Sequence, residues 1–324
     1  MKFQFIELIE KNVMKRKIDR IVHITLLTLL VLAVGSCGGD GMDPQGPVLI
    51  DPDPVIEDPV EEEPVEEPVK EYKLPNIDLS NWKVTLPIGS PTEVKPPEIL
   101  DYAENETLKP FMYNDSVNGA LVFYTYPGAT TANTSYSRTE LREQMEPGSN
   151  DVNWTFEQGG RMKGKLQLAD ISKDNEGKYH RTIIMQIHGR LTDAQRDLIG
   201  EDDNNAPPIL KIYWYKGLVR VKSKVLKDKQ ASDTEILHTD AWGDDEGFNF
   251  SAQVGFEPFT LEIIATKGKL EIVLNEDEKY VIENEDMERW SVFENYFKAG
   301  NYLATLDEGS FAKVKYYELD VVHD

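Results

Sequence analysis

Short segments rich in β-branched and aromatic residues, separated by turn residues, fill the chain from about residue 74 to its C-terminus. Two pairs of these segments, each joined by a Lys-Gly turn, predict β-hairpins: residues 210–215 with 218–225, and residues 259–266 with 270–274. Residues 120–126 predict another strand, and residues 311–322 predict one further strand or a pair. Helical periodicity is scarce, and only residues 192–199 read as a short helix, with Thr192 as its N-cap.

So many antiparallel strands within about 250 residues predict an all-β fold. We expect a β-sandwich of the jelly-roll kind, in which one concave sheet forms a groove. Residues 74–324 are assigned to this single domain.

Residues 181–188 predict a strand that is polar on one side and apolar on the other. Because strand side chains alternate, one face is expected to carry Thr182, Ile184, Gln186 and His188, and the other Ile183, Met185 and Ile187. Gln186 and His188 then project into the same space. They are either structural groups satisfied at a strand end or members of a site.

Two further segments have the same alternation. Residues 136–143 place Tyr136, Arg138, Glu140 and Arg142 on one side. Residues 296–302 place Tyr296, Lys298 and Tyr302 on one side, and Gly300 leaves room for a close approach to the backbone. The three polar faces together supply the groups that can hold an acidic sugar and move protons on it.

A fourth polar face has two interpretations. Residues 218–225 alternate Arg220, Lys222 and Lys224 with valines. This pattern fits a solvated face over a core face, and it also fits a basic lane for a polyuronate.

The N-terminal part of the chain is expected to be a lipoprotein leader and a tether. Residues 1–36 contain the apolar run 21–34, which is too short to span a bilayer comfortably and is typical of a signal peptide; translation starts at Met1 or Met14. Cys37, the single cysteine, follows Val34-Gly35-Ser36, which resembles a bacterial lipobox. We expect an exported protein that is lipid-anchored to the cell envelope, in the outer membrane and facing the periplasm or the surface. Residues 37–73 form a Pro/Glu-rich linker.

The charge distribution excludes nucleic acid as a partner. Of the formal net charge of −23, residues 1–36 carry +3 and residues 38–70 carry −10, which leaves −16 for the remainder. Nucleic-acid binding needs an extended basic footprint, so a polyanionic substrate would need a local basic groove on this acidic body. Asp244, Asp245 and Glu246 lack the spacing of a calcium loop, and the scattered histidines indicate no zinc site. We expect no metal.

Three motifs, taken in order, resemble the signature segments of the alginate lyases of polysaccharide lyase family 7: Arg-Thr-Glu-Leu-Arg at 138–142, Gln-Ile-His at 186–188 and Tyr-Phe-Lys-Ala-Gly-Asn-Tyr at 296–302. The segment 79–87 also looks like the start of that family's catalytic domain. The resemblance covers residues 74–324 and implies a jelly-roll fold, no cofactor and alginate as substrate. A monomer is expected.

The resemblance also implies roles for these residues. Cleavage of a 4-linked uronate by β-elimination removes the C5 proton and protonates the departing O4, and the carboxylate beside C5 must be neutralised first. Arg138 and Gln186 are expected to neutralise it, His188 to take the proton in guluronate, and Tyr302 to protonate O4; for mannuronate Tyr302 is expected to do both, with its pKa lowered by nearby cations. Arg142, Lys298 and Tyr296 are expected to bind substrate, and Glu140 to fix the two arginines.

Several points stay open at the level of sequence. Ala304 stands where the family commonly has a glutamine, which puts the details of the subsites in doubt. By the resemblance, the Gln-Ile-His form implies acceptance of guluronate, and the polar segment 189–208 is expected to decide between internal and terminal cutting. The alternatives are a noncatalytic alginate-binding module, which would release no product, and a lyase for another polyuronate. A glycoside hydrolase is disfavoured because no pair of flanking carboxylates is evident.

Overall fold

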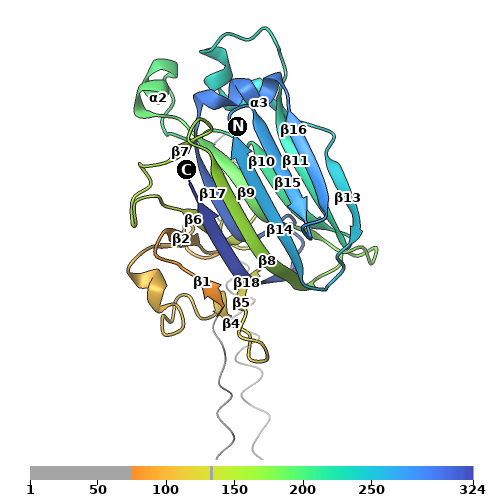
Figure 1. Ribbon diagram of the computed structural model, residues 1–324. Coiled ribbons are helices and arrows are strands. Elements are labelled where there is room, and N and C mark those ends of the chain that lie inside the picture. Colours follow the sequence, from red (N-terminus) through yellow and green to blue (C-terminus); the bar gives the residue numbers. More distant parts are fainter. Residues whose placement is uncertain (1–74, 132–133, 324) are drawn as a thin grey trace, which may run out of the picture. The chain divides into compact units, whose positions relative to one another are not determined.

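The structure is a computed structural model that describes residues 75–131 and 134–323. The expected signal peptide (1–36), Cys37 and the linker up to residue 73 lie outside the described residues. Within the described ranges two sheets pack face to face, as Figure 1 shows. This confirms the predicted jelly-roll β-sandwich. No helix among the described residues is long and apolar enough to cross a membrane.

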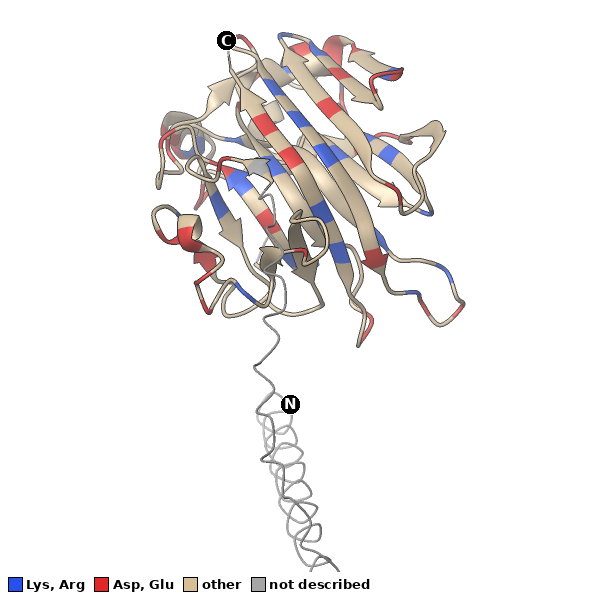
Figure 2. Cartoon of the chain, turned by 60° about the horizontal axis from the view of Figure 1, so that its bottom comes forward, with Lys and Arg blue, Asp and Glu red and all other residues tan. Residues whose placement is uncertain are grey.

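The first sheet has eight strands within the described ranges. Their order is β16 (Glu278–Glu283), β15 (Lys269–Leu274), β14 (Phe259–Thr266), β8 (Gly160–Ile171), β18 (Ala312–Val322), β5 (Leu121–Thr125) and β4 (Met112–Asn114), and β1 (Asn76–Ile77) pairs in parallel with β18. Figure 2 shows that the strands of this sheet carry both basic and acidic residues.

The second sheet has ten strands within the described ranges and carries the candidate site. Their order is β12 (Trp242–Asp244), β11 (Leu218–Leu226), β10 (Leu210–Tyr215), β9 (Arg181–Arg190), β17 (Glu294–Leu303), β6 (Arg138–Glu143), β2 (Trp82–Thr85) and β3 (Glu93–Val94); β13 (Phe248–Gln253) pairs with β11, and β7 (Trp154–Thr155) pairs with β17.

Both predicted hairpins are confirmed. β10 and β11 pair around Lys216 and Gly217, whose positive φ angles of 54° and 82° suit the tight turn that joins two twisted antiparallel strands. β14 and β15 pair around a two-residue turn that contains Gly268. The segment 311–322 forms one strand, β18, and not a pair.

The predicted helix is confirmed as α2 (Asp193–Ile199). Thr192 caps it, because its side chain accepts a hydrogen bond from the backbone N–H of Gln195, whose own side chain bonds back to the N-cap backbone. The expectation of a single helix is wrong, because α3 (Glu285–Arg289) is also present, with Asn284 as its N-cap. Four 3₁₀ turns complete the described elements: η1 (Glu98–Asp101), η2 (Glu235–Leu237), η3 (Thr239–Ala241) and η4 (Trp290–Val292).

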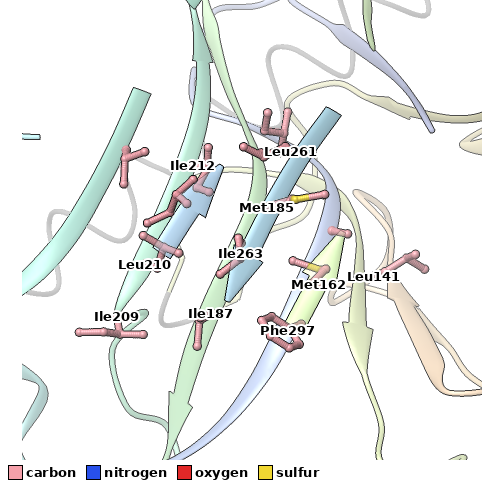
Figure 3. Close-up of a cluster of buried hydrophobic side chains, with 14 of the residues drawn as sticks. Leu141, Met162, Met185, Ile187, Ile209, Leu210, Ile212, Leu261, Ile263 and Phe297 are labelled. Atoms are coloured by element: carbon pink, nitrogen blue, oxygen red, sulfur yellow. The ribbon is translucent and has the colours of Figure 1, made fainter. Parts of the chain in front are cut away.

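Apolar side chains from the inner faces of both sheets form the core. Figure 3 shows Met162, Leu261 and Ile263 of the first sheet facing Met185, Ile187 and Phe297 of the second. All six are fully buried. Burying an aliphatic or aromatic side chain of this size contributes about 1.5–3 kcal/mol, so this layer fixes the strands that carry the site.

The alternation predicted for residues 181–188 breaks in the middle of β9. The register against β10 and against β17 shifts between Met185 and Ile183, so one residue is inserted as a β-bulge. Ile184 therefore joins Met185 and Ile187 in the hydrophobic core, and the prediction that Ile184 shares the face of Gln186 is wrong. The predicted faces of Thr182 and Ile183 are reversed for the same reason, because Ile183 pairs with Tyr213 on the side of Gln186 and Thr182 turns inward. Gln186 and His188 lie beyond the bulge and keep their common face.

Asn301 ties the two sheets together beside the predicted site. Its side chain is fully buried and donates to the backbone carbonyls of Phe123 and Ala312, at 2.9 and 2.8 Å, in the first sheet. Its oxygen accepts a bond of 2.7 Å from the Thr182 hydroxyl. These bonds hold β17 at the residue next to Tyr302.

Candidate active site

The ladders between β6, β17 and β9 bring the three predicted polar faces together. Tyr302 pairs with Arg138, and Lys298 pairs with both Arg142 and Gln186. The predicted common face across three strands is thus confirmed for seven of the residues named from the sequence: Arg138, Glu140, Arg142, Gln186, His188, Tyr296 and Lys298. Tyr302 is the eighth and lies at the far end of this face, opposite Arg138.

A cavity of about 510 Å³ lies over this face. It is lined by Lys83, Thr85, Glu93, Thr131, Thr134, Arg138, Arg142, Asn150, Asp151, His188, Arg190, Asp203, Asn204, Asn205, Tyr296 and Lys298. Glu140, Gln186 and Tyr302 are not among the lining residues. The segment 189–208, which was expected to border the groove, contributes Arg190 and residues 203–205 to its wall.

Glu140 is the centre of the charged cluster beneath the cavity. It is 1% exposed, and its Oε1 accepts a 2.5 Å bond from Nε2 of Gln186. Its Oε2 pairs with the Lys298 ammonium and lies 3.8 Å from Nη1 of Arg138. Glu140 therefore fixes Arg138 and Lys298, and the expectation that it fixes both arginines is wrong.

Arg142 is held by other partners. Its Nη1 donates to the Glu143 carbonyl at 2.7 Å, and its Nη2 donates to the Asn150 carbonyl at 3.1 Å and to Oδ1 of Asn153 at 2.8 Å. Arg142 is 6% exposed, and burial lowers the pKa of its guanidinium.

The cations of the cluster are poorly solvated. Burial and then the charge of Arg138 lower the pKa of Lys298 to about 8, against the opposing influence of Glu140. The buried Nε of Arg138 has no hydrogen-bond partner among the described residues. A buried donor without a partner is costly, so this atom is suited to meet a carboxylate of a ligand.

His188 is arranged as a neutral base. Its Nδ1 lies 3.0 Å from the Gly189 carbonyl oxygen, which can only accept, so Nδ1 carries the proton and Nε2 keeps its lone pair. Burial lowers the pKa of His188 well below its usual value, and Lys298 and Arg138 lower it further. The imidazole is therefore neutral at ordinary pH.

Tyr302 is arranged as an acid. Burial raises its pKa, and this effect outweighs the opposing influence of Arg138, whose Cζ lies 5.4 Å from the ring centroid. The expectation that neighbouring cations bring the pKa of Tyr302 below its usual value is therefore wrong. A phenol with a raised pKa retains its proton until a stronger base, such as a departing oxygen, takes it.

The sequence interpretation missed several lining residues. Lys83 on β2 pairs with Glu93 at 2.7 Å, and Arg190 pairs with Glu294 at 3.1 Å and with Asp151 at 3.0 Å. Arg190 could have been predicted from the sequence, because it lies two residues after His188 and so continues the alternation of Gln186 and His188. Asn150 and Asn153 lie on a loop and carried no periodic signal.

The basic face of β11 is largely paired within the protein. Lys224 forms an ion pair of 2.6 Å with Asp244, and Arg220 donates to Asn249 Oδ1 at 2.8 Å. Asp245 accepts bonds of 3.1 Å from the backbone and hydroxyl of Ser223. The acidic segment 244–246 therefore covers this lane.

Comparison with known proteins gives a consistent result. The family model described as "Alginate lyase" matches residues 77–323. Among solved structures, alginate lyase A1-II′, a member of polysaccharide lyase family 7, is 28% identical, with a TM-score of 0.62 over 77% of this chain and 97% of its own. An alginate lyase from Pseudomonas aeruginosa is 20% identical, with a TM-score of 0.57 over 76% of this chain and 100% of its own, and shows the same fold.

A1-II′ has also been solved with bound sugars. A Tyr-to-Phe variant was in complex with product (GGG), at 28% identity and a TM-score of 0.62 over 77% of this chain and 97% of its own. A variant with His-to-Asn and Tyr-to-Phe replacements was in complex with substrate (GGMG), at 27% identity and a TM-score of 0.61 over 77% of this chain and 95% of its own. No protein in the curated set matches the chain.

Proposed function

The chain belongs to the alginate lyase family and is an alginate lyase, and on that premise we propose which of its residues carry the β-elimination. The reaction needs a base for the C5 proton, an acid for O4 and positive charge for the intermediate anion that forms beside the carboxylate. The cluster around Glu140 offers one candidate for each task.

His188 is the base that removes the C5 proton. The observation that carries this assignment is the 3.0 Å contact between Nδ1 and the Gly189 carbonyl, which leaves Nε2 unprotonated in a residue that lines the cavity. The lowered pKa keeps the ring neutral and ready to accept a proton. The same shift makes the imidazole a weaker base, and the nearby carboxylate of bound substrate would offset part of it.

Tyr302 is the acid that protonates O4. Its raised pKa keeps the phenol protonated, and β17 carries it on the same face as Lys298. The A1-II′ variants that bind product or substrate lack a tyrosine, or a histidine and a tyrosine, which supports a pair of these residue types.

Arg138 and Lys298 neutralise the carboxylate of the cleaved sugar, and Gln186 supports them. Arg138 has the unpartnered Nε, and Lys298 lies at the cavity wall. Gln186 is 2% exposed and donates to Glu140, so it acts mainly by orienting that carboxylate. The arrangement places a cationic centre where negative charge develops.

Guluronate is the preferred residue at the cleavage site. A separate neutral base and a separate acid suit anti elimination, in which the C5 hydrogen and O4 lie on opposite faces. Using Tyr302 for both steps would need a phenolate, which its raised pKa disfavours. The rival candidate, a noncatalytic alginate-binding module, leaves the His188 and Tyr302 pair without a task.

Incubation of the purified protein with poly-guluronate and poly-mannuronate tests the proposal. We expect ultraviolet absorbance from unsaturated uronate ends, appearing faster with poly-guluronate, and product sizing over time would distinguish internal from terminal cutting. Faster cleavage of poly-mannuronate would contradict the preference. Binding without product would favour the module, and saturated ends would indicate a hydrolase.

Export and lipid anchoring at Cys37 remain part of this proposal, and they are supported by the sequence of residues 1–73 alone. The enzyme would be a monomer held off the membrane by the acidic linker. A Cys37→Ser variant should move from the membrane fraction to the soluble fraction with unchanged activity. Wild-type protein found entirely in the soluble fraction would refute the anchor.

A further inference from the structure

Three side chains from three neighbouring strands form a stack in the wall of the cavity. The rings of Tyr296 and His188 lie 13° from parallel with centroids 5.1 Å apart, and Cζ of Arg142 lies 4.1 Å from the Tyr296 centroid. Tyr296 pairs with His188 in the ladder between β17 and β9, and Arg142 reaches it diagonally from β6. Tyr296 thus lies between a cation and the imidazole.

The outer end of the stack is fixed in place. Arg142 makes its three hydrogen bonds to Glu143, Asn150 and Asn153, all at 3.1 Å or less. Bonds from two different terminal nitrogens set the plane of the guanidinium as well as its position. A planar cation over an aromatic face is attracted by about 0.5–2 kcal/mol, so Arg142 restrains the Tyr296 ring.

The inner end of the stack is the imidazole that takes the proton. The Gly189 carbonyl restrains His188 at Nδ1, and Tyr296 restrains one face of its ring. These two contacts together set the direction in which Nε2 points. Proton abstraction depends on that direction, because a misplacement of about 1 Å can cost 100-fold in rate.

We propose that Arg142 is a positioning residue, which acts through the Tyr296 ring to aim Nε2 of His188 at the substrate. This inference rests on the proposed role of His188 as the base. It differs from the expectation that Arg142 and Tyr296 bind carboxylates directly, because their described contacts are to the protein and to each other. Asn153 contributes to the same positioning, because its side chain accepts a hydrogen bond from the Arg142 guanidinium.

Steady-state kinetics on poly-guluronate can separate positioning from binding. Arg142→Lys keeps the positive charge but lacks the planar guanidinium. Tyr296→Leu lacks the aromatic ring, whereas Tyr296→Phe keeps it and is the matched comparison. We expect the first two to lower kcat about tenfold or more with KM nearly unchanged, and Tyr296→Phe to lose clearly less kcat than Tyr296→Leu. Asn153→Ala should give a smaller loss of kcat. Thermal midpoints confirm that each variant is folded.

Two further backgrounds make the test decisive. In His188→Ala, whose residual rate is measurable because a general base contributes about 100- to 10,000-fold, Arg142→Lys should cause no additional loss. In Tyr302→Phe, whose turnover should be too slow to disturb a binding measurement, Arg142→Lys should leave the Kd of an oligoguluronate unchanged by calorimetry.

Additive losses of kcat in the His188→Ala background, or a weakened Kd in the Tyr302→Phe background, would overturn the positioning role and make Arg142 a substrate ligand. If Arg142→Lys does not fold, Tyr296→Leu against Tyr296→Phe gives the same comparison. A wild-type kcat for His188→Ala alone would instead show that the proposed base is wrong, so the two failures are distinguishable.

Discussion

The hydroxyl of Tyr316, a residue of the first sheet, accepts a 3.1 Å hydrogen bond from the backbone N–H of Gly300 in the second sheet. The same hydroxyl donates a 2.5 Å bond to the carbonyl of Ile184. Both partners lie where the ladder between β9 and β17 shifts register. Tyr316 therefore satisfies two backbone groups at the bulge that separates the Tyr302 end of the site from the His188 end.

Tyr316→Phe should destabilise the fold, because it leaves both backbone groups unpaired in the interior. An unsatisfied buried group costs about 1–3 kcal/mol, so the free energy of unfolding should fall by at least that amount. Urea denaturation measures it, and Tyr317→Phe is the matched control, since that hydroxyl bonds to Gln167 on the outer, half-buried face. Equal stability of the two variants would contradict the role of Tyr316.

Lys298 should set the alkaline limit of activity. With a pKa of about 8, it loses its charge as the pH rises through that value, and the cluster around Glu140 then loses a cation. We expect kcat/KM to fall above about pH 8 and the fall to move to higher pH in Lys298→Arg, whose guanidinium stays charged. An alkaline limb that is identical in both proteins would assign it to another group.

Unfolding does not explain that decline. Between about pH 8 and the ordinary lysine value of 10.5, the unfolded chain binds more protons at this residue than the folded chain does. This group's contribution to stability therefore rises with pH across that window. The thermal midpoint followed over the same range separates loss of activity from loss of fold.

The affinity for alginate should depend on salt. Arg138 and Lys298 in the cavity wall can meet a polyanion, and Arg142 adds positive charge to the same wall, while the remainder of the domain is acidic. Salt screens such attraction over roughly 8–10 Å at ordinary ionic strength, so KM should rise with salt more than kcat falls. The measurement is a series of Michaelis curves in sodium chloride. A KM that does not respond to salt would contradict electrostatic binding.

A buried carboxylate below the site depends on a residue at the end of the chain. Glu143 is 4% exposed, and its Oε1 lies 2.5 Å from Nε2 of His323, while its Oε2 accepts bonds from Trp154 and from the backbone of Phe297. His323→Ala should lower the free energy of unfolding by about 3 kcal/mol, because it removes one partner of a buried pair. His323→Gln, which keeps a donor, should lose less. Identical denaturation curves for wild type and His323→Ala would refute this.

Strand alternation predicted most of the site, because Arg138, Glu140 and Arg142 lie two residues apart on an unbroken strand, and so do Tyr296 and Lys298. It failed at Ile184, because the bulge is stabilised by Tyr316, 132 positions along the chain and in the other sheet. No local pattern encodes such a contact. The close approach predicted at Gly300 is present, but the approaching group is the backbone of β6: a Cβ there would lie 2.7 Å from the Thr139 carbonyl oxygen.

Side-chain partners were less predictable than faces. The sequence placed Glu140 between two arginines, yet Lys298, diagonally across the ladder, is its ion partner, and Arg142 turns toward a loop. Loop residues such as Asn153 follow no period. The helix α3 has five residues, which is too short for a helical repeat to be visible.

The central claim is that His188 and Tyr302 act as separate base and acid on guluronate. Its most direct test is the initial rate of formation of unsaturated uronate from poly-guluronate by His188→Ala and Tyr302→Phe, with folding checked by circular dichroism. Each loss should reach about 100- to 10,000-fold, the usual contribution of a general acid or base. A folded Tyr302→Phe or His188→Ala variant that retains the wild-type rate would contradict the assignment of that residue.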